Sequence, residues 1–328
     1  MNEHFYYTFL AGWCAEAVGC GLEFKYRRFT RDEVIDAMHF NGDDFNHGSG
    51  RITDDSEMEL CVLEALVEGY NDEYFPSDRI AEKYIEWYKS GPSDVGQTVS
   101  FALLDASDEI DMMGNVLEYN KDSESNGALM RCIPLAIFGV IKGEDKLFSM
   151  CESETKLTHH RSIVSTISLI YCTVIARILR CKMNNEHIDI PAIFETIVSL
   201  LDSQKLKDWY GEACNLPDLL NYNALKNEGH VKHAFIFFIY FLNNIQQYSY
   251  ERAIQEVLMC GGDTDTNAKI IGNLFGAYYG DCVPEYMSNS VLHYDNTRTV
   301  QYLSRPEKYG VKYGIRLLKR LSRKIIQK

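Results

Sequence analysis

Paired cysteines, prolines and linkers are scarce in this 328-residue chain. It has seven prolines, no stretch rich in Gly and Ser, and no repeat of fixed period, so nothing of this kind divides it into domains. Ten cysteines occur without a C-x-x-C pair, and most lie among apolar residues, as Cys61, Cys132 and Cys172 do. This pattern excludes a disulfide scaffold or a zinc ribbon and favours a reducing, intracellular compartment, which we expect to be the cytoplasm.

Long hydrophobic runs are also missing. The longest, "AFIFFIYFL" at 234–242, is too short to span a bilayer. The first residues lack the basic segment of a signal peptide and carry Glu3 and Glu16. Hydrophobic residues at 46% and charged residues at 24% match a soluble globular protein. We therefore expect no transmembrane segment and no secretion signal.

Positively charged residues are fewer than negatively charged ones, with 33 Lys or Arg against 47 Asp or Glu. The resulting net charge of −14 argues against general nucleic-acid binding. The deficit is uneven, because residues 305–328 contain nine Lys or Arg and one Glu, a balance of +8 that leaves −22 for the first 304 residues. In this tail Ile315, Leu318 and Ile325 share one helical stripe among basic residues. The tail is predicted to be a terminal helix docked on the acidic body, with a membrane or partner anchor as the alternative.

Hairpin signals are scarce, and helical periodicity dominates the chain. We predict one all-α domain over residues 1–300, followed by a basic amphipathic helix at 301–328 packed on it, and a monomer. A strand or two could occur within 38–52 and 284–300. The clearest predicted helices are 56–69, with Ser56 and Glu59 placed as a capping box, 77–91, and the buried segments 162–180 and 231–245.

Small residues recur every fourth position after residue 267. Ala268, Gly272, Gly276 and Gly280 would form a smooth ridge on one helix face. Each glycine inside a helix costs about 1 kcal/mol relative to alanine. The ridge therefore predicts that another backbone approaches this helix closely and fixes its N-terminus in the core.

Two acidic clusters open two of the predicted helices, 208 residues apart between Asp55 and Asp263. One is T-D-D at 53–55 and the other is D-T-D-T at 263–266. Helix N-termini favour carboxylates, so capping alone is one interpretation. Capping needs a single side chain, however, and adjacent buried carboxylates repel each other unless a cation compensates. A metal site built from both clusters is the alternative hypothesis.

Oxygen ligands without His or Cys are typical of Mg²⁺, Mn²⁺ or Ca²⁺ rather than zinc. A calcium loop of the EF-hand type can be tested on the second cluster, because Asp263, Asp265 and Asn267 fit its first, third and fifth positions. It fails at the sixth position, where Ala268 replaces the required glycine, and at the twelfth, where Leu274 replaces a bidentate glutamate.

At this point six stretches, in the expected order, resemble the signatures of the ADP-ribosylglycohydrolase family, which includes bacterial dinitrogenase reductase-activating glycohydrolases and eukaryotic ADP-ribosylhydrolases. The resemblance covers about residues 11–286. The stretches are "AGWCAEAVGCGLEF", "TDDSEM", "GPSDVGQT", "SNGALMRCIPLAI", "LTHHRS" and "GGDTDTNAKIIGNLFGAYYG".

The resemblance implies an orthogonal all-α bundle and a site with two Mg²⁺ or Mn²⁺ ions. It also implies hydrolysis of the glycosidic bond between ADP-ribose and a protein side chain or related conjugate. Such cleavage passes through an oxocarbenium-like centre and needs a protonated leaving group and an activated water. The metal ligands carried over by position are Thr53, Asp54, Asp55, Asp263, Asp265 and Thr266.

Two carboxylates are candidates for proton transfer. Glu23 aligns with a glutamate that some eukaryotic relatives use near the metals, and Asp94 aligns with an aspartate of bacterial relatives; we favour Glu23. Without the resemblance they would be a surface residue and a turn residue. The family usually has Gly-Asp where this chain has Ala15-Glu16, which puts the support of the ligands in question. The predicted substrate-binding residues are Gly96, Ser123, Ser125, Asn126, Gly127 and His159, with a structural role as the alternative for His159.

Three functions compete at this level. The first is the metal-dependent hydrolase acting on an ADP-ribosylated protein or ADP-ribose conjugate, which the intact T-D-D and D-T-D-T clusters favour. The second is an inactive relative that binds ADP-ribose or serves a structural role. The third is a metal hydrolase for another nucleotide or glycosyl substrate, a choice that the loops at 38–50 and 108–124 would determine.

Overall fold

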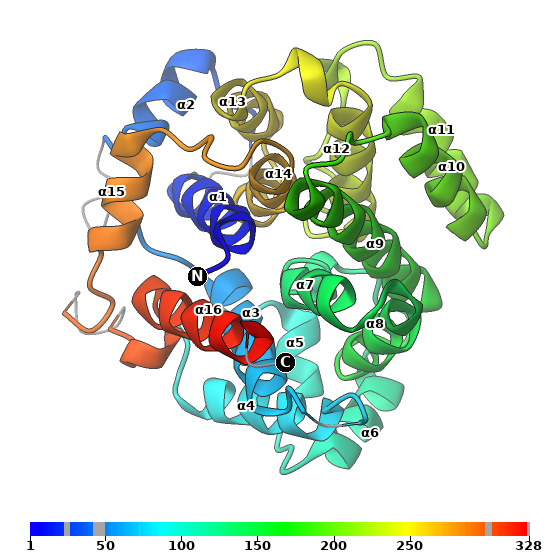
Figure 1. Ribbon diagram of the computed structural model, residues 1–328, viewed down its shortest axis with the longest axis vertical. Coiled ribbons are helices and arrows are strands. Elements are labelled where there is room, and N and C mark those ends of the chain that lie inside the picture. Colours follow the sequence, from blue (N-terminus) through cyan, green and yellow to red (C-terminus); the bar gives the residue numbers. More distant parts are fainter. Residues whose placement is uncertain (23–26, 42–49, 72, 299–303, 327–328) are drawn as a thin grey trace.

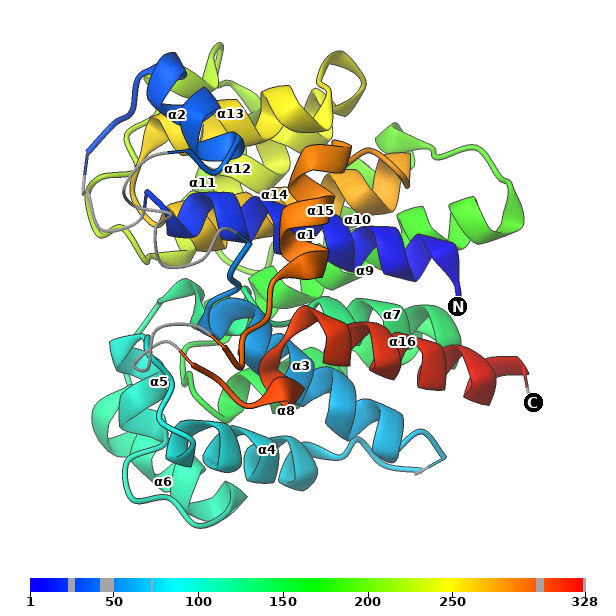
Figure 2. The ribbon, with the colours of Figure 1, turned by 90° about the vertical axis from the view of Figure 1, so that its left-hand side faces the viewer.

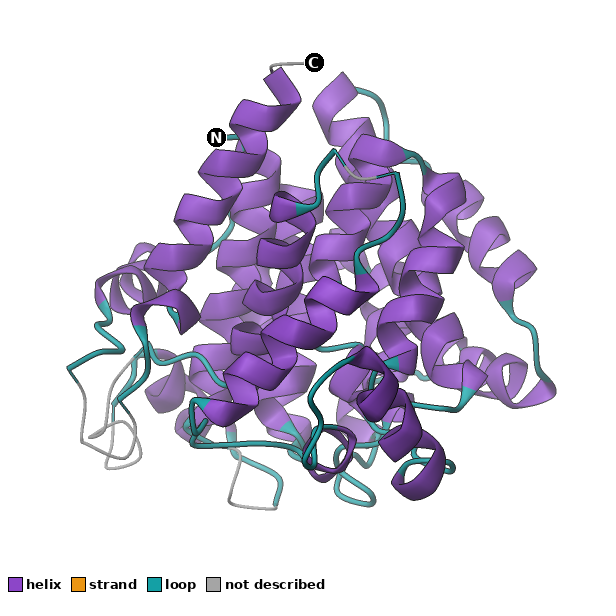
Figure 3. Cartoon of the chain, turned by 90° about the horizontal axis from the view of Figure 1, so that it is seen from below, coloured by secondary structure: helices purple, strands orange, loops and turns teal. Residues whose placement is uncertain are grey.

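The computed structural model describes residues 1–22, 27–41, 50–71, 73–298 and 304–326. Within these residues the chain forms sixteen α-helices and no β-strand (Figures 1 and 3), which confirms the all-α prediction. The helices are α1 Glu3–Cys20, α2 Arg31–Met38, α3 Asp54–Glu68, α4 Ser77–Lys89, α5 Gln97–Ala102, α6 Glu109–Tyr119, α7 Ile133–Lys142, α8 Leu147–Lys156, α9 Ser162–Asn184, α10 Ile190–Leu200, α11 Gln204–Cys214, α12 Val231–Asn243, α13 Tyr250–Cys260, α14 Thr264–Tyr279, α15 Glu285–His293 and α16 Val311–Ile326.

Helices α1 and α14 run antiparallel at the centre of the upper half of the molecule (Figures 1 and 2). Their backbones touch along the predicted ridge of small residues. A Cβ added at Gly272 would lie 2.5 Å from the carbonyl oxygen of Ala11, and one at Gly276 would lie 2.5 Å from that of Tyr7. The predicted close approach is therefore confirmed for these two glycines. Gly280 serves another purpose, because it ends α14 with a positive φ of 78°.

Helix α9 is the one described helix whose length and composition would let it cross a membrane. The most apolar window of α9 is 78% buried inside the protein, where it packs against α7, α8 and α14. Burial on nearly every side explains why its sequence is apolar on nearly every side. The predicted buried segments 162–180 and 231–245 thus correspond to α9 and α12. That no segment spans a membrane stays a prediction.

Two sequence predictions about local structure are wrong. Ser56 and Glu59 do not form a capping box, because α3 begins at Asp54 and both side chains are buried in polar contacts with other helices. No strand occurs in the described parts of 38–52 and 284–300, and α15 occupies 285–293 instead.

The C-terminal helix α16 packs against α3 and α1 through a stripe that includes the buried Leu317, Leu318 and Leu321. The chain just before it is held by a buried ion pair, in which Arg305 Nη2 lies 2.8 Å from Glu57 Oε2 of α3. At the other end of α16, the hydroxyl of Ser322 accepts a hydrogen bond of 2.9 Å from the backbone N–H of Asn2. Helix α16 therefore lies against α3 and α1, and the division of the chain at residue 300 stays a prediction.

Candidate functional site

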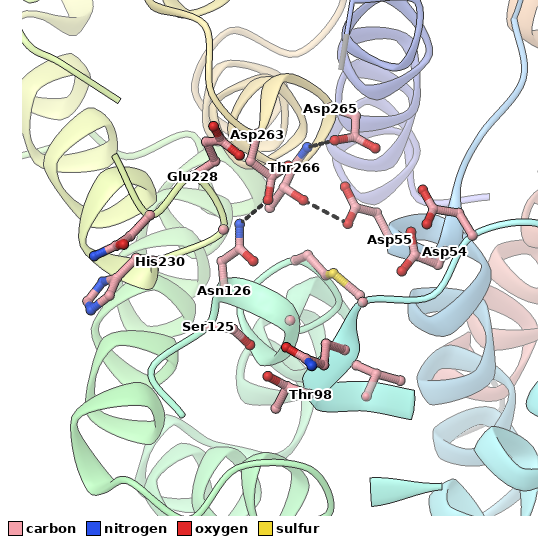
Figure 4. Close-up of a pocket in the computed structure, with 18 of the residues that line it drawn as sticks. Asp54, Asp55, Thr98, Ser125, Asn126, Glu228, His230, Asp263, Asp265 and Thr266 are labelled. Atoms are coloured by element: carbon pink, nitrogen blue, oxygen red, sulfur yellow. Dashed lines mark hydrogen bonds between the residues drawn. The ribbon is translucent and has the colours of Figure 1, made fainter. Parts of the chain in front are cut away.

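An open cavity of about 450 Å³ lies where the first turns of α3, α5 and α14 meet (Figure 4). Two further segments complete its wall, at residues 124–130 and 227–230. The only β-bridge among the described residues joins these two segments, because Ser125 and His230 pair across it. Five of the six predicted metal ligands line this cavity: Asp54, Asp55, Asp263, Asp265 and Thr266.

The two acidic clusters are tied to each other by hydrogen bonds across the start of both helices. The Thr53 hydroxyl donates to Asp265 Oδ2 at 3.1 Å, and the Thr266 hydroxyl donates to Asp55 Oδ1 at 3.0 Å (Figure 4). Thr53 is buried and does not line the cavity. Neither helix has a side-chain cap at its N-cap residue. Capping alone therefore does not account for the clusters, since their oxygens face each other and the cavity.

Burial makes the carboxylates of this site poor at holding negative charge. Burial, followed by the charges of Asp94, Glu57 and Asp263, raises the pKa of Asp54 to about 7, although a hydrogen bond from the Gly96 N–H opposes the rise. Burial and the Glu16 charge raise the pKa of Asp55 well above its ordinary value. Carboxylates with raised pKa values gain most from a cation placed among them.

The donor chemistry of the cavity fits a hard divalent cation. Carboxylate and hydroxyl oxygens dominate its acidic side, and Asp55 Oδ2 is buried with no hydrogen-bond partner. Such an orphaned oxygen is costly unless something binds it. Among the described residues, however, no three His, Cys, Asp or Glu side chains are already gathered tightly enough to hold an ion. Metal binding by these residues therefore stays a prediction that their chemistry favours.

Glu16, which stands where the family usually has aspartate, is fully buried beneath the first acidic cluster. Its Oε1 accepts a hydrogen bond from the Thr53 N–H at 2.6 Å and lies 3.1 Å from the Thr53 hydroxyl oxygen, and its Oε2 accepts from the Ser56 hydroxyl. Lys269 of α14 lies 3.1 Å from Glu16 Oε2 and 3.2 Å from Glu59 Oε2. This Glu16–Lys269–Glu59 cluster joins α1, α3 and α14 directly behind the candidate ligands.

The two candidate proton-transfer residues have different outcomes. Asp94 lines the cavity together with Gly96, and burial raises its pKa against the opposing effect of the Val95 N–H. Glu23 lies outside the described residues. The structure thus brings Asp94 next to the acidic clusters, and the role of either carboxylate stays a prediction.

The predicted substrate-binding residues of the N-G segment surround the other side of the cavity. Asn126 Nδ2 donates to Asp263 Oδ2 at 2.7 Å, which links this side to the second acidic cluster (Figure 4). Ser125 and Gly127 line the cavity as well, whereas Ser123 does not. The Ser123 hydroxyl lies 2.8 Å from that of Thr98, a cavity residue, so it supports the wall from behind.

His159 lies behind Ser125 rather than in the cavity. Its ring is buried, with Nε2 2.7 Å from the Ser125 hydroxyl and Nδ1 2.8 Å from the Thr158 hydroxyl. Arg131 donates to the same Thr158 oxygen at 2.8 Å, which favours the tautomer in which Thr158 donates to Nδ1 and the Nε2–H donates to Ser125. Burial lowers the pKa of His159 to about 3, aided by the Arg131 charge, so the ring is neutral at pH 7. The Ser125 hydroxyl is then free to donate into the cavity.

Several cavity residues escaped the sequence analysis. They lie on the first turn of α5, on either side of the N-G segment and in the polar loop before α12, and they are Gln97, Thr98, Val99, Glu124, Met130, Asn227, Glu228, Gly229 and His230. The sequence of this loop carries one weak turn signal, an Asn followed two residues later by a Gly. The structure agrees with a tight turn there, since Asn227 has a positive φ of 55°. The apolar run that begins at 231 is the stronger pattern in this region of the sequence.

Glu124 joins the two wall segments. Glu124 lies 2.5 Å from Lys205 Nζ, 3.3 Å from Arg161 Nη2 and 3.2 Å from His230 Nε2. Burial would raise the pKa of Glu124, but the hydrogen bond and charge of Lys205, with His230 and Arg161, lower it overall. An ionised Glu124 therefore holds the His230 loop beside Ser125.

Comparisons with known proteins agree with this fold. The ADP-ribosylglycohydrolase family profile matches residues 2–310. A protein of Acanthamoeba polyphaga mimivirus that is named as an ADP-ribosyl glycohydrolase is 31% identical over 265 residues, which cover 77% of this chain and 78% of that one. The ADP-ribosyl-[dinitrogen reductase] glycohydrolase of Rhodospirillum rubrum is 24% identical over 285 residues, covering 84% and 86%.

Among solved structures, an ADP-ribosylglycohydrolase-related protein complex matches with a TM-score of 0.61 and 19% identity, covering 89% of this chain and 98% of that one. This likeness concerns the fold. Together with the match over residues 2–310 and the relative that is 31% identical, it shows that the chain belongs to the ADP-ribosylglycohydrolase family.

Proposed function

We propose that the protein is a hydrolase that cleaves the glycosidic bond between ADP-ribose and a modified protein side chain or related conjugate, and that it uses two Mg²⁺ or Mn²⁺ ions. One observation carries this proposal. Acidic clusters from opposite ends of the sequence meet in one cavity, where Asp54, Asp55, Asp263, Asp265 and Thr266 face the same space. The names of the family and of its relatives support the substrate class.

The residues that would hold the ions are those five together with Thr53. When bound, such ions polarise a water molecule and hold neighbouring ribose hydroxyls. The Glu16–Lys269–Glu59 cluster keeps the first turn of α3 in place through the Thr53 N–H. Hydrogen bonds between the clusters then set the positions of Asp55 and Asp265 before any ligand arrives.

The chain's own groups supply the remaining functions. Asp94 lies in the cavity, where burial raises the pKa of its carboxyl and so favours a part in proton transfer to the leaving group. Ser125, held by neutral His159, donates a hydrogen bond toward a phosphate or ribose oxygen. Asn126 keeps Asp263 turned to the cavity.

The test is release of ADP-ribose from a panel of conjugates. The purified protein is stripped with EDTA, Mg²⁺ or Mn²⁺ is added back, and conjugates linked through arginine, serine or an acetyl ester are followed by chromatography. We expect hydrolysis of at least one linkage only with metal. Asp54→Ala and Asp265→Ala should abolish it, and should also lose the rise in Tm that Mn²⁺ gives the unaltered protein.

Asp208→Ala is the matched control, since this exposed aspartate of α11 contacts only Gln204 among the described residues. It should keep both turnover and the Mn²⁺-dependent Tm. Full turnover in Asp54→Ala or Asp265→Ala would rule out the metal-centred mechanism. Tight binding of ADP-ribose without release from any conjugate would instead identify an inactive, ADP-ribose-binding family member.

A further inference from the structure

An exposed apolar surface lies on the outer side of α5 and α6, and we call it the α5–α6 surface. Thirteen large hydrophobic residues are exposed in the described part of the chain, and six of them fall within residues 101–119. Ile110 is 78% exposed and Leu117 is 60% exposed. The whole surface consists of Phe101, Leu104, Ile110, Met113, Leu117 and Tyr119.

The fold itself does not need these side chains. Helix α6 already buries Met112 and Val116 against its neighbours. Ile110, Met113 and Leu117 recur at spacings of three and four on a different, solvent-exposed face, and a Cβ added at Gly114 between them would have nothing within 4 Å. Together they form a second apolar stripe, which is typical of a helix that contacts something on both sides. Among the described residues nothing buries Ile110 or Leu117 of this stripe by more than half.

The surface adjoins the cavity through helix α5. The first turn of α5 provides Gln97, Thr98 and Val99 to the cavity wall. Phe101 follows on the same helix, and its ring lies 5.9 Å from that of Tyr119 on α6. Helices α5 and α6 pack against each other, and Figure 2 shows them together at the lower left of the molecule. A bound chain leaving the cavity past α5 would therefore meet the α5–α6 surface.

Negative charge surrounds the apolar stripe. Residues 97–124 contain seven Asp or Glu and only one Lys or Arg, Lys121, a net charge of −6. With 100° between successive residues of a helix, Asp111 and Glu118 lie along one edge of the α6 stripe and Glu109 lies along the other. Such a rim disfavours an acidic partner, including a second copy of this chain with its charge of −14, and favours a basic one.

We propose that the α5–α6 surface binds a segment of the ADP-ribosylated protein that is apolar and flanked by Lys or Arg, and so holds the modified side chain at the cavity. This proposal rests on the proposed function and adds to it the part of the substrate that lies outside the ADP-ribose. It also gives a physical basis for the expectation that residues 108–124 determine substrate choice.

The experiment compares three probes: ADP-ribose on a single amino acid, on a synthetic peptide with Leu and Lys neighbours, and on the same peptide with Ser and Glu neighbours. The linkage is the one that the conjugate panel identifies. The variant is Ile110→Ser/Leu117→Ser. The matched control is Val198→Ser/Ile326→Ser, which removes two apolar side chains that are also more than half exposed, one from α10 and one from α16.

The unaltered protein and the control should prefer the Leu/Lys peptide to the Ser/Glu peptide by roughly tenfold in kcat/KM, mainly through KM, because each exposed anchor contributes a modest apolar burial. Ile110→Ser/Leu117→Ser should lose this preference and still hydrolyse the amino-acid conjugate at the normal rate. Glu109→Gln/Glu118→Gln should reduce the salt dependence of KM for the Leu/Lys peptide.

An unchanged preference in Ile110→Ser/Leu117→Ser, or no preference in the unaltered protein, would overturn the proposal while leaving the hydrolase intact. If no conjugate is cleaved at all, the proposed function fails, and the surface is judged by binding alone. Fluorescence anisotropy of the labelled, unmodified Leu/Lys peptide should then show binding to the unaltered protein and at least tenfold weaker binding to the variant. Equal binding to both proteins would refute the proposal that the α5–α6 surface binds the peptide.

Discussion

Replacing Lys269 by methionine is expected to destabilise the metal-free protein, and to do so more strongly as the pH rises. Methionine keeps most of the apolar volume and removes only the ammonium group. That ammonium lies 3.1 Å from Glu16 Oε2, 3.2 Å from Glu59 Oε2 and 2.5 Å from the Ser56 hydroxyl, with no exposed surface. Its loss leaves two buried carboxyls without a cation.

The magnitude follows from these contacts. Breaking a buried ion pair by removing one partner costs about 3–5 kcal/mol. Burial already raises the pKa of Glu59 to about 7, against the lowering effect of Lys269. A carboxyl with a raised pKa stabilises the fold fully below its unfolded pKa and loses that contribution as the pH rises through the folded value. Without Lys269 the folded pKa rises further, so each pH unit above 7 adds about 1.4 kcal/mol. We expect a loss of about 3 kcal/mol at pH 6 and about 5–6 kcal/mol at pH 9.

The assay is denaturant unfolding of the EDTA-treated protein at pH 6, 7, 8 and 9. Lys207→Met, at an exposed position of α11, serves as the control and should change the free energy of unfolding by less than about 0.5 kcal/mol. Adding Glu59→Gln to Lys269→Met should remove the extra loss above pH 7 and provides a second variant if the single one does not fold. A penalty that is below 1 kcal/mol, or that is the same at pH 6 and pH 9, would refute the reasoning.

Two further predictions concern the support of the cavity and the central helix pair. Because burial lowers the pKa of His159 to about 3, only the unfolded chain takes up a proton at this ring as the pH falls below about 6.5. The free energy of unfolding should therefore be about 2 kcal/mol lower at pH 5 than at pH 7 from this residue alone, and His159→Gln should lack this contribution. An equal loss of stability in the variant would contradict the buried, neutral ring. Gly276→Ala should cost more than about 2 kcal/mol, since its Cβ would lie 2.5 Å from the Tyr7 carbonyl oxygen; Gly211→Ala in α11, where nothing lies within 4 Å, should instead stabilise by about 0.5–1 kcal/mol.

Much of the fold could be predicted from local patterns. Periodicity identified α4, α9 and α12, and the stripe of small residues predicted that α14 is clasped by another backbone. The Ser56–Glu59 capping box was wrong because the same letters serve a buried polar cluster, whose partners Glu16 and Lys269 come from α1 and α14. Sequence spacing cannot distinguish these two uses when the partners are remote in the chain.

The candidate site could be predicted where it carries motifs and not elsewhere. The acidic clusters and the N-G segment were found, and the structure places them around one cavity. His159 lies behind the cavity wall and not in the cavity because its ring contacts the Ser125 hydroxyl, and no sequence pattern encodes this contact. The Asn227–His230 loop has no motif at all. The intracellular location, the monomeric state and the absence of general nucleic-acid binding remain predictions.

The hydrogen bond between Asn2 and Ser322 has a practical consequence for handling the protein. Helix α1 leads from this bond to the cavity over eighteen residues, about 27 Å, and Figure 2 shows both chain ends on one side of the molecule. An affinity tag or a sensor-chip linker attached at either terminus would therefore project away from the reactive end. Immobilised protein should keep its cavity open to solution, so the two attachment points can serve as interchangeable handles in the binding measurements.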